Sequence, residues 1–237
     1  MPIGLALLVS ADSTTIQQLS HALQEFSISP DVCREVPAAM HLLTHQKFEV
    51  VIVDLELGEQ SGLILNAIQL SPANRTAVTF VITGTDSQAT AAYQKMAGFA
   101  FERPLSAESI RRTLKPAYGL ILRERRRYFR CPISVPVLIR RDTMPDVCGQ
   151  SINISEGGMA VSTSVQFGVG QEVQVQFPLV GQKVPFSAAS TVCWRKTEHL
   201  GVRFLTVPQE SQSRLQVWLS QKLEDMLPES VAEKFQN

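Results

Sequence analysis

Four arginines gather in residues 125–137, RRRYFRCPISVPV, although the whole chain of 237 residues has 22 basic and 22 acidic residues and no net charge. A guanidinium group presents a planar fork of donors that matches a phosphate or the acceptor edge of a guanine. Zero net charge argues against general affinity for nucleic acid or an acidic membrane, so the anion site must be local. The arginines of this cluster are Arg125, Arg126, Arg127 and Arg130.

A second polar motif, NISEGG, follows after one predicted strand. Its Asn153 and Ser155 would offer polar groups to a base edge or a phosphate from the end of a strand. Gly157 and Gly158 carry no side chain, so a ligand can approach the backbone closely. The two motifs together predict a site for a compact anionic ligand.

This pair of motifs, R-x-x-x-R followed by N-x-S-x-x-G on an all-β background, resembles the PilZ domain, a receptor for cyclic di-GMP. The resemblance covers about residues 123–226. It implies that Arg126 and Arg130 contact guanine edges and phosphates, while Arg127 falls in the variable part of the motif. The ligand-binding residues that we expect are Arg125, Arg126, Arg130, Asn153, Ser155, Gly157 and Gly158.

The region after residue 131 has the pattern of an antiparallel barrel. Its β-branched runs alternate with polar residues and are separated by Gly and Pro, and an amphipathic helix is predicted over about residues 209–226. We expect Tyr128 and Phe129 to pack the arginine segment onto the barrel. Trp194 and Arg195 lie either near the ligand or at an ordinary strand end.

Residues 1–118 alternate between short apolar runs and helical patterns, which predicts a doubly wound, parallel five-stranded sheet. The expected strands are 5–9, 28–32, 50–53, 78–82 and 99–101. The expected helices are 15–26, 36–45, 61–70, 87–97 and 106–114, with Asp12 or Ser13 as the first cap. A single long helix over 106–127 is an alternative, but Pro116 favours a kink or break.

This half resembles the response-regulator receiver domain. The motif VVIVDLELGEQSG places Asp54 at the end of the third strand, FVITGTDS places Thr83 in the switch position, and FAFERPLS places Arg103 where the family has lysine. A receiver also needs an acidic pair after its first strand to hold Mg²⁺. Ser10 and Ala11 stand there instead.

We therefore expect Asp54 to be a vestigial phosphoacceptor without phosphoryl chemistry. The alternative is Mg²⁺-dependent phosphorylation supported by Asp12 and Asp54 alone. His41 and His45 are one helical turn apart, but no third ligand is in view, so we expect no metal site. The four cysteines lack C-x-x-C spacing and fit a reducing, cytoplasmic setting.

The expected organisation is a receiver-like domain over 1–118, a linker and arginine arm over 119–130, a PilZ-like barrel with its helix over 131–226, and a tail over 227–237. No catalytic motif is found, so we expect a non-enzymatic bacterial signalling receptor without a cofactor. Cyclic di-GMP would change its domain orientation and its binding to a protein partner. We expect no DNA binding and no membrane insertion; the receiver faces and the last helix offer surfaces for a homodimer.

The alternative function is a phosphorylation-switched response regulator in which the barrel is the output platform. A nucleic-acid binder that uses residues 123–130 is a third class, which the neutral charge and the lack of a second basic stripe disfavour.

Overall fold

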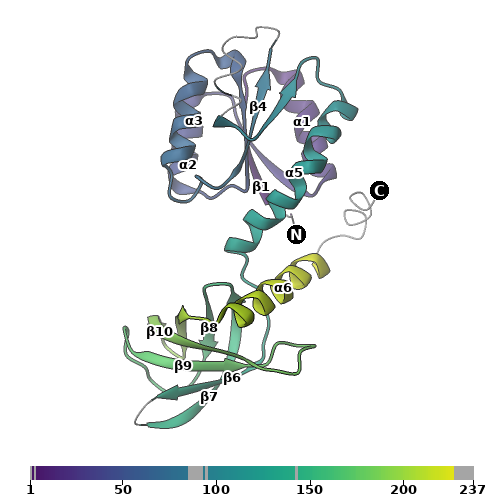
Figure 1. Ribbon diagram of the computed structural model, residues 1–237. Helices are drawn as coiled ribbons and strands as arrows, with labels where there is room; N and C mark the ends of the chain where they lie inside the picture. Colours follow the sequence, from purple (N-terminus) through teal and green to yellow (C-terminus); the bar gives the residue numbers. More distant parts are fainter. Residues whose placement is uncertain (1, 3, 85–92, 94–95, 142–143, 227–237) are drawn as a thin grey trace. The chain divides into compact units, whose positions relative to one another are not determined.

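The computed structural model describes residues 2, 4–84, 93, 96–141 and 144–226 (Figure 1). The chain forms two compact units, one extending to Arg125 and the other spanning Arg126–Met226. The helix expected over 87–97 and the tail over 227–237 lie wholly or mostly outside the described residues. No helix within the described ranges has both the length and the apolar character needed to span a bilayer.

The first unit contains a parallel five-stranded sheet in the order β2-β1-β3-β4-β5, as the sequence predicted. The central strands read as continuous apolar runs because both faces of the sheet are covered by helices. The strands are β1 (Gly4–Val9), β2 (Ile28–Cys33), β3 (Val50–Asp54), β4 (Val78–Thr83) and β5 (Phe99–Glu102), and a 3₁₀ turn, η1 (Leu55–Leu57), follows β3.

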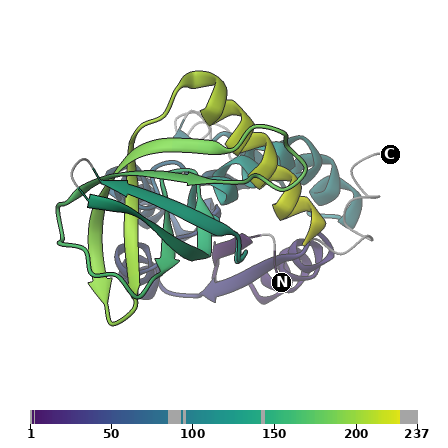
Figure 2. The same cartoon turned by 90° about the horizontal axis from the view of Figure 1, so that it is seen from below.

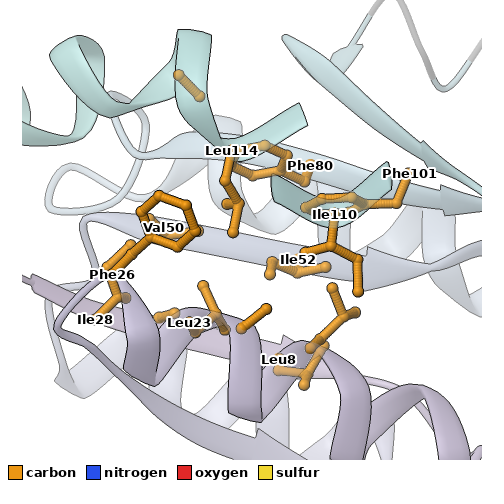
Figure 3. Close-up of a cluster of buried hydrophobic side chains, with 14 of the residues drawn as sticks. Leu8, Leu23, Phe26, Ile28, Val50, Ile52, Phe80, Phe101, Ile110 and Leu114 are labelled. Carbon is orange, nitrogen blue, oxygen red and sulfur yellow. The ribbon is translucent and has the colours of Figure 1, made fainter. Parts of the chain in front are cut away.

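Two apolar clusters hold the helices on the two faces of this sheet. On one face, Leu23 of α1 (Ser13–Glu25) and Leu114 of α5 (Ala107–Tyr128) meet Leu8 and Phe80 of the strands (Figure 3). On the other face, α2 (Val36–His45) and α3 (Gln60–Leu70) cover Val51 and its neighbours. Asp12 caps α1 by accepting a hydrogen bond of 2.8 Å from the Thr15 N–H. The pKa of its carboxyl group is lowered by hydrogen bonding to Thr15, first to the side chain and then to the N–H.

Helix α5 corrects the expected linker, because residues 119–128 are helical and continue the helix without a break at Pro116. The buried stripe of the helix passes Pro116 through Ala117, Tyr118 and Ile121. Proline has no N–H to donate to the carbonyl four residues earlier. That carbonyl belongs to Arg112, an exposed residue, so water can supply the missing donor. Apolar packing thus outweighs the local cost of proline.

The end of α5 is fixed to the first unit by a polar contact. Glu124 is buried, and its Oε1 accepts hydrogen bonds from Lys47 Nζ at 2.5 Å and from Thr76 Oγ1 at 2.6 Å. A buried carboxylate needs such partners to offset its loss of hydration.

The second unit is a closed antiparallel barrel (Figure 2). Its strand order is β10-β11-β8-β7-β6-β9, and β9 and β10 also pair. Helix α6 (Gln209–Asp225) packs against it through Leu215, Trp218, Leu219 and Leu223. The strands are β6 (Pro136–Arg141), β7 (Met144–Ser155), β8 (Gly158–Ser162), β9 (Glu172–Phe177), β10 (Phe186–Lys196) and β11 (His199–Thr206).

Candidate functional site

An isolated bridge between Cys131 and Ile154 brings the two sequence motifs together. Cys131 N–H donates to the Ile154 carbonyl at 2.7 Å, and Ile154 N–H donates back to the Cys131 carbonyl at 3.0 Å. Cys131 follows Arg130 directly, and Ile154 lies between Asn153 and Ser155. The arginine motif is therefore attached to the N-x-S-x-x-G strand by the backbone. Burial raises the pKa of the Cys131 thiol, so this cysteine serves as an apolar filler.

A β-bulge shapes the second motif. The register of β7 against β8 shifts between Ser151 and Asn153, which leaves Ile152 as an extra, exposed residue. A bulge of this kind re-aims the side chains that follow it. Asn153 Oδ1 lies buried without a hydrogen-bond partner within the described part of the chain. A buried acceptor without a donor lowers the stability of the folded state unless a hydrogen-bond donor reaches it.

Ser155 and Gly158 close the tight turn between β7 and β8. Ser155 Oγ donates to the Gly158 carbonyl at 2.9 Å. A Cβ atom at Gly158 would lie 2.2 Å from the Val202 carbonyl oxygen of β11, so only glycine allows the strands to approach this closely. Gly157 is exposed, and a Cβ there would meet no atom within 4 Å. The two glycines therefore have different roles.

A second bulge exposes Trp194. The register of β10 against β11 shifts between Val192 and Trp194, so Cys193 and Trp194 are both exposed where strict alternation would bury one of them. The Trp194 indole lies over Gly201, where a Cβ atom would be 2.0 Å from Nε1. This glycine leaves room for the indole against β11, and 46% of Trp194 stays exposed.

These features border one hollow of about 350 Å³ on the second unit. Such a volume lies near the lower end of the range for small-molecule sites, about 300–1,000 Å³. Two arginines of the cluster, the turn of the second motif and the Trp194 ring meet there. The lining residues are Arg127, Arg130, Ser155, Gly157, Gly158, Met159, Ala160, Cys193, Trp194, Gly201, Val202 and Arg203.

The sequence prediction places some residues at this hollow and misses others. Arg130, Ser155, Gly157 and Gly158 line it as expected, and so does Trp194. Asn153 and Arg195 do not line it. Arg127, Cys193 and Arg203 also line it and were not predicted. Cys193 and Arg203 lie on strands β10 and β11, far along the chain from both motifs, so their proximity depends on the closed barrel.

The remaining predicted arginines have protein partners. Arg125 Nη1 lies 3.3 Å from Oε1 of the buried Glu49 of the first unit. Arg126 Nη1 donates at 2.6 Å to Ser220 Oγ of α6. Neither arginine lines the hollow. Phe129 is buried as expected, and Tyr128 is 45% exposed.

The first unit has its own polar centre around Asp54, which is 1% exposed at the end of β3. Arg103 Nη2 donates to Asp54 Oδ2 at 2.8 Å, and Ser10 Oγ donates to the same oxygen at 2.6 Å. The Glu56 N–H donates to Oδ1 at 3.1 Å. Both carboxylate oxygens of Asp54 therefore already accept hydrogen bonds from this chain.

The donors around Asp54 are not those of a metal centre. A divalent cation takes oxygen ligands, preferably carboxylates, whereas Ser10 offers one neutral hydroxyl in place of an acid and Arg103 brings a cationic group to the Asp54 carboxylate. Arg103 Nε also bonds Glu56 Oε1 at 2.8 Å, which fixes the guanidinium beside Asp54. Thr83, in the expected switch position, is buried and donates to the Phe101 carbonyl at 3.3 Å. No group of three or more His, Cys, Asp or Glu suited to a metal occurs among the residues described.

His41 and His45 are exposed on α2 with their rings stacked, the centroids 4.3 Å apart. His45 Nδ1 lies 2.9 Å from the His41 carbonyl oxygen, which is a contact along the helix. The pair therefore forms part of a helix surface.

The two units define a protein built from a receiver-like module and a barrel with an arginine-lined hollow. The strand order of the first unit is that of the CheY-type doubly wound sheet. Residues 124–221 match the family model described as PilZ domain, so the second unit is a PilZ domain.

Comparison with solved structures finds similar folds for each half, and no curated protein matches the chain. The receiver domain of a LuxO repressor protein from Vibrio parahaemolyticus is 19% identical over 52% of this chain and 92% of its own, with a TM-score of 0.42. Chemotaxis response regulator CheY4 of Vibrio cholerae is 17% identical over 49% and 97%, with a TM-score of 0.42. The PilZ domain of CeSA from a cellulose-synthesising bacterium is 21% identical over 40% and 98%, with a TM-score of 0.33.

Proposed function

We propose that this protein is a non-enzymatic receptor that binds cyclic di-GMP in the hollow of its PilZ domain. The observation that supports this most is the convergence of Arg127, Arg130 and Trp194 on the turn of the N-x-S-x-x-G motif. The ligand carries two phosphates and two guanines. Arginine forks match both the phosphates and the guanine O6/N7 edge.

Two further groups complement this chemistry, Trp194 in the hollow and Asn153, which belongs to the second motif but does not line the hollow. The exposed Trp194 indole offers a flat apolar face to a guanine ring, a contact worth about 1–3 kcal/mol per base. Asn153 Oδ1 is a buried acceptor without a partner among the described residues, and the guanine N1–H and N2–H₂ groups are donors. A small rearrangement of β7 on binding would bring these guanine donors within hydrogen-bonding distance of Asn153 Oδ1.

Signalling would follow from the position of the arginine motif. The chain passes from the first unit to the second between Arg125 and Arg126. A ligand that binds arginines at this boundary would restrict the conformations of the connection and thereby change domain orientation. The receiver-like unit would then serve as a docking surface for a protein partner. Small-angle scattering with and without ligand tests this part, and identical profiles at saturation would refute it.

Isothermal titration calorimetry with cyclic di-GMP tests the binding itself. Charge-assisted hydrogen bonds contribute about 1.5–3 kcal/mol each, so Arg126→Ala, Arg127→Ala and Arg130→Ala should each weaken binding about tenfold or more. Arg140→Ala is the matched control, because Arg140 pairs with Asp146 away from the hollow. Parent-like affinity in Arg126→Ala and Arg130→Ala, or no binding by the parent, would contradict the assignment.

A further inference from the structure

Helix α6 holds residues of both ligand-binding motifs through two side chains one helical turn apart. Ser220 Oγ accepts the 2.6 Å hydrogen bond from Arg126, the first arginine of R-x-x-x-R. Gln216 Nε2 donates at 3.4 Å to Glu156 Oε2, inside the N-x-S-x-x-G motif. Gln216 and Ser220 share one face of the helix because they are four residues apart.

The Arg126 contact is a defined one. Ser220 Oγ donates its own proton to the Gln216 carbonyl at 2.6 Å, so its remaining lone pairs face the guanidinium. Arg126 and Ser220 are both half-buried, which weakens competition from water. With this partner, Arg126 does not reach the hollow that Arg127 and Arg130 line.

We propose that α6 is an autoinhibitory element that sequesters Arg126 through Ser220, and that cyclic di-GMP must displace this contact in order to bind. The proposal rests on the proposed function. The affinity observed for a ligand is reduced by the fraction of protein in the competent state. A neutral hydrogen-bond acceptor such as Ser220 reduces that fraction without abolishing it, and the first consequence of binding is the release of α6 from the arginine motif.

Substitution at position 220 can either weaken or strengthen the hold of α6 on Arg126. Ser220→Ala removes this acceptor from Arg126, so affinity for cyclic di-GMP should rise about three- to tenfold. Ser220→Asp turns the hydrogen bond into an ion pair and should lower the affinity by a similar factor. Ser211→Ala is the matched control, because Ser211 on the same helix accepts a bond from Arg214 instead.

The measurement is calorimetry on the full chain, with the same pair of substitutions repeated in an Arg126→Ala background. If Ser220 acts by holding Arg126, its effect disappears when Arg126 is absent. An effect of Ser220→Ala that persists in that background, an unchanged affinity, or weaker binding by Ser220→Ala would each overturn the inference. If the parent protein does not bind cyclic di-GMP, the proposed function is refuted and this inference with it. If the parent binds and Ser220→Ala leaves the affinity unchanged, the inference alone is refuted.

Discussion

Arg103 lies 2.8 Å from Asp54 and donates to Oδ2, the carboxylate oxygen to which Ser10 also donates. A phosphoacceptor needs a free carboxylate oxygen as nucleophile and a divalent cation to neutralise the incoming phosphoryl group. Here an arginine and a serine stand where that chemistry would occur. The phosphorylation-switched alternative therefore makes a prediction opposite to ours.

We expect no phosphoryl group on Asp54 after incubation with acetyl phosphate and Mg²⁺, as measured by intact mass. Asp54→Asn serves as the control for modification elsewhere. A stoichiometric mass gain in the parent that is lost in Asp54→Asn would show that the vestigial site still works.

Removal of Arg103 should destabilise the protein. Among the described residues, Arg103→Ala leaves the buried Asp54 carboxylate with Ser10 and the Glu56 N–H as donors, and breaking a buried pair typically costs about 3–5 kcal/mol. We expect the free energy of unfolding to fall by about 3 kcal/mol, near the lower end of this range, because those donors remain. Urea unfolding followed by circular dichroism measures it. Arg140→Ala breaks an exposed pair and should change stability by less than about 1 kcal/mol.

The neighbouring glycines of the second motif should respond differently to alanine. Gly158→Ala forces a methyl group against the Val202 carbonyl and should lower the free energy of unfolding by about 2–3 kcal/mol. Gly157→Ala points into open space and should change stability by less than about 0.5 kcal/mol. Both tryptophans, Trp194 and Trp218, belong to the barrel unit, so tryptophan fluorescence during urea unfolding reports on it. Equal stabilities of the two variants would mean that the close approach at Gly158 is wrong.

Cysteine alkylation should map the hollow. Cys148 and Cys193 are exposed, whereas Cys33 and Cys131 are buried and burial raises the pKa of both thiols. A raised pKa means less thiolate at a given pH, and thiolate is the reactive form. Iodoacetamide at neutral pH should therefore label Cys148 and Cys193 first. Cyclic di-GMP should protect Cys193, which lines the hollow, and leave Cys148 as an internal control. Equal labelling of Cys193 with and without saturating ligand contradicts the site.

The sequence predicted the arrangement of the first unit because its signals are local. Apolar runs such as Val50–Asp54 are buried on both faces, and the amphipathic pattern of α1 places Leu19 and Leu23 in the core. The same local logic failed at Pro116, where the sequence pattern favoured a kink or break. The break did not occur because Glu124, buried against Lys47 and Thr76, and the apolar stripe hold the helix to its end.

The candidate site was predicted only in part, for a related reason. Arg130 and Ser155 lie within motifs that one backbone bridge joins, so their spacing in the sequence is informative. Cys193 enters the hollow because a bulge shifts the alternation of β10, and a bulge of this kind has no signature in residue types alone. The partner of Arg126 is Ser220, on a helix 94 residues later, and only tertiary packing brings them together.

The closed barrel also bears on how this chain would aggregate. Because β9 and β10 complete the ring, the described strands of the PilZ domain offer no open sheet edge as a template for another strand. The parallel sheet does have two edges, β2 and β5. Pro30 lies in β2 and has no N–H to donate, which is a recognised means of blunting an edge. Strand β5, with the sequence FAFE, has no such proline, so intermolecular strand addition should begin there.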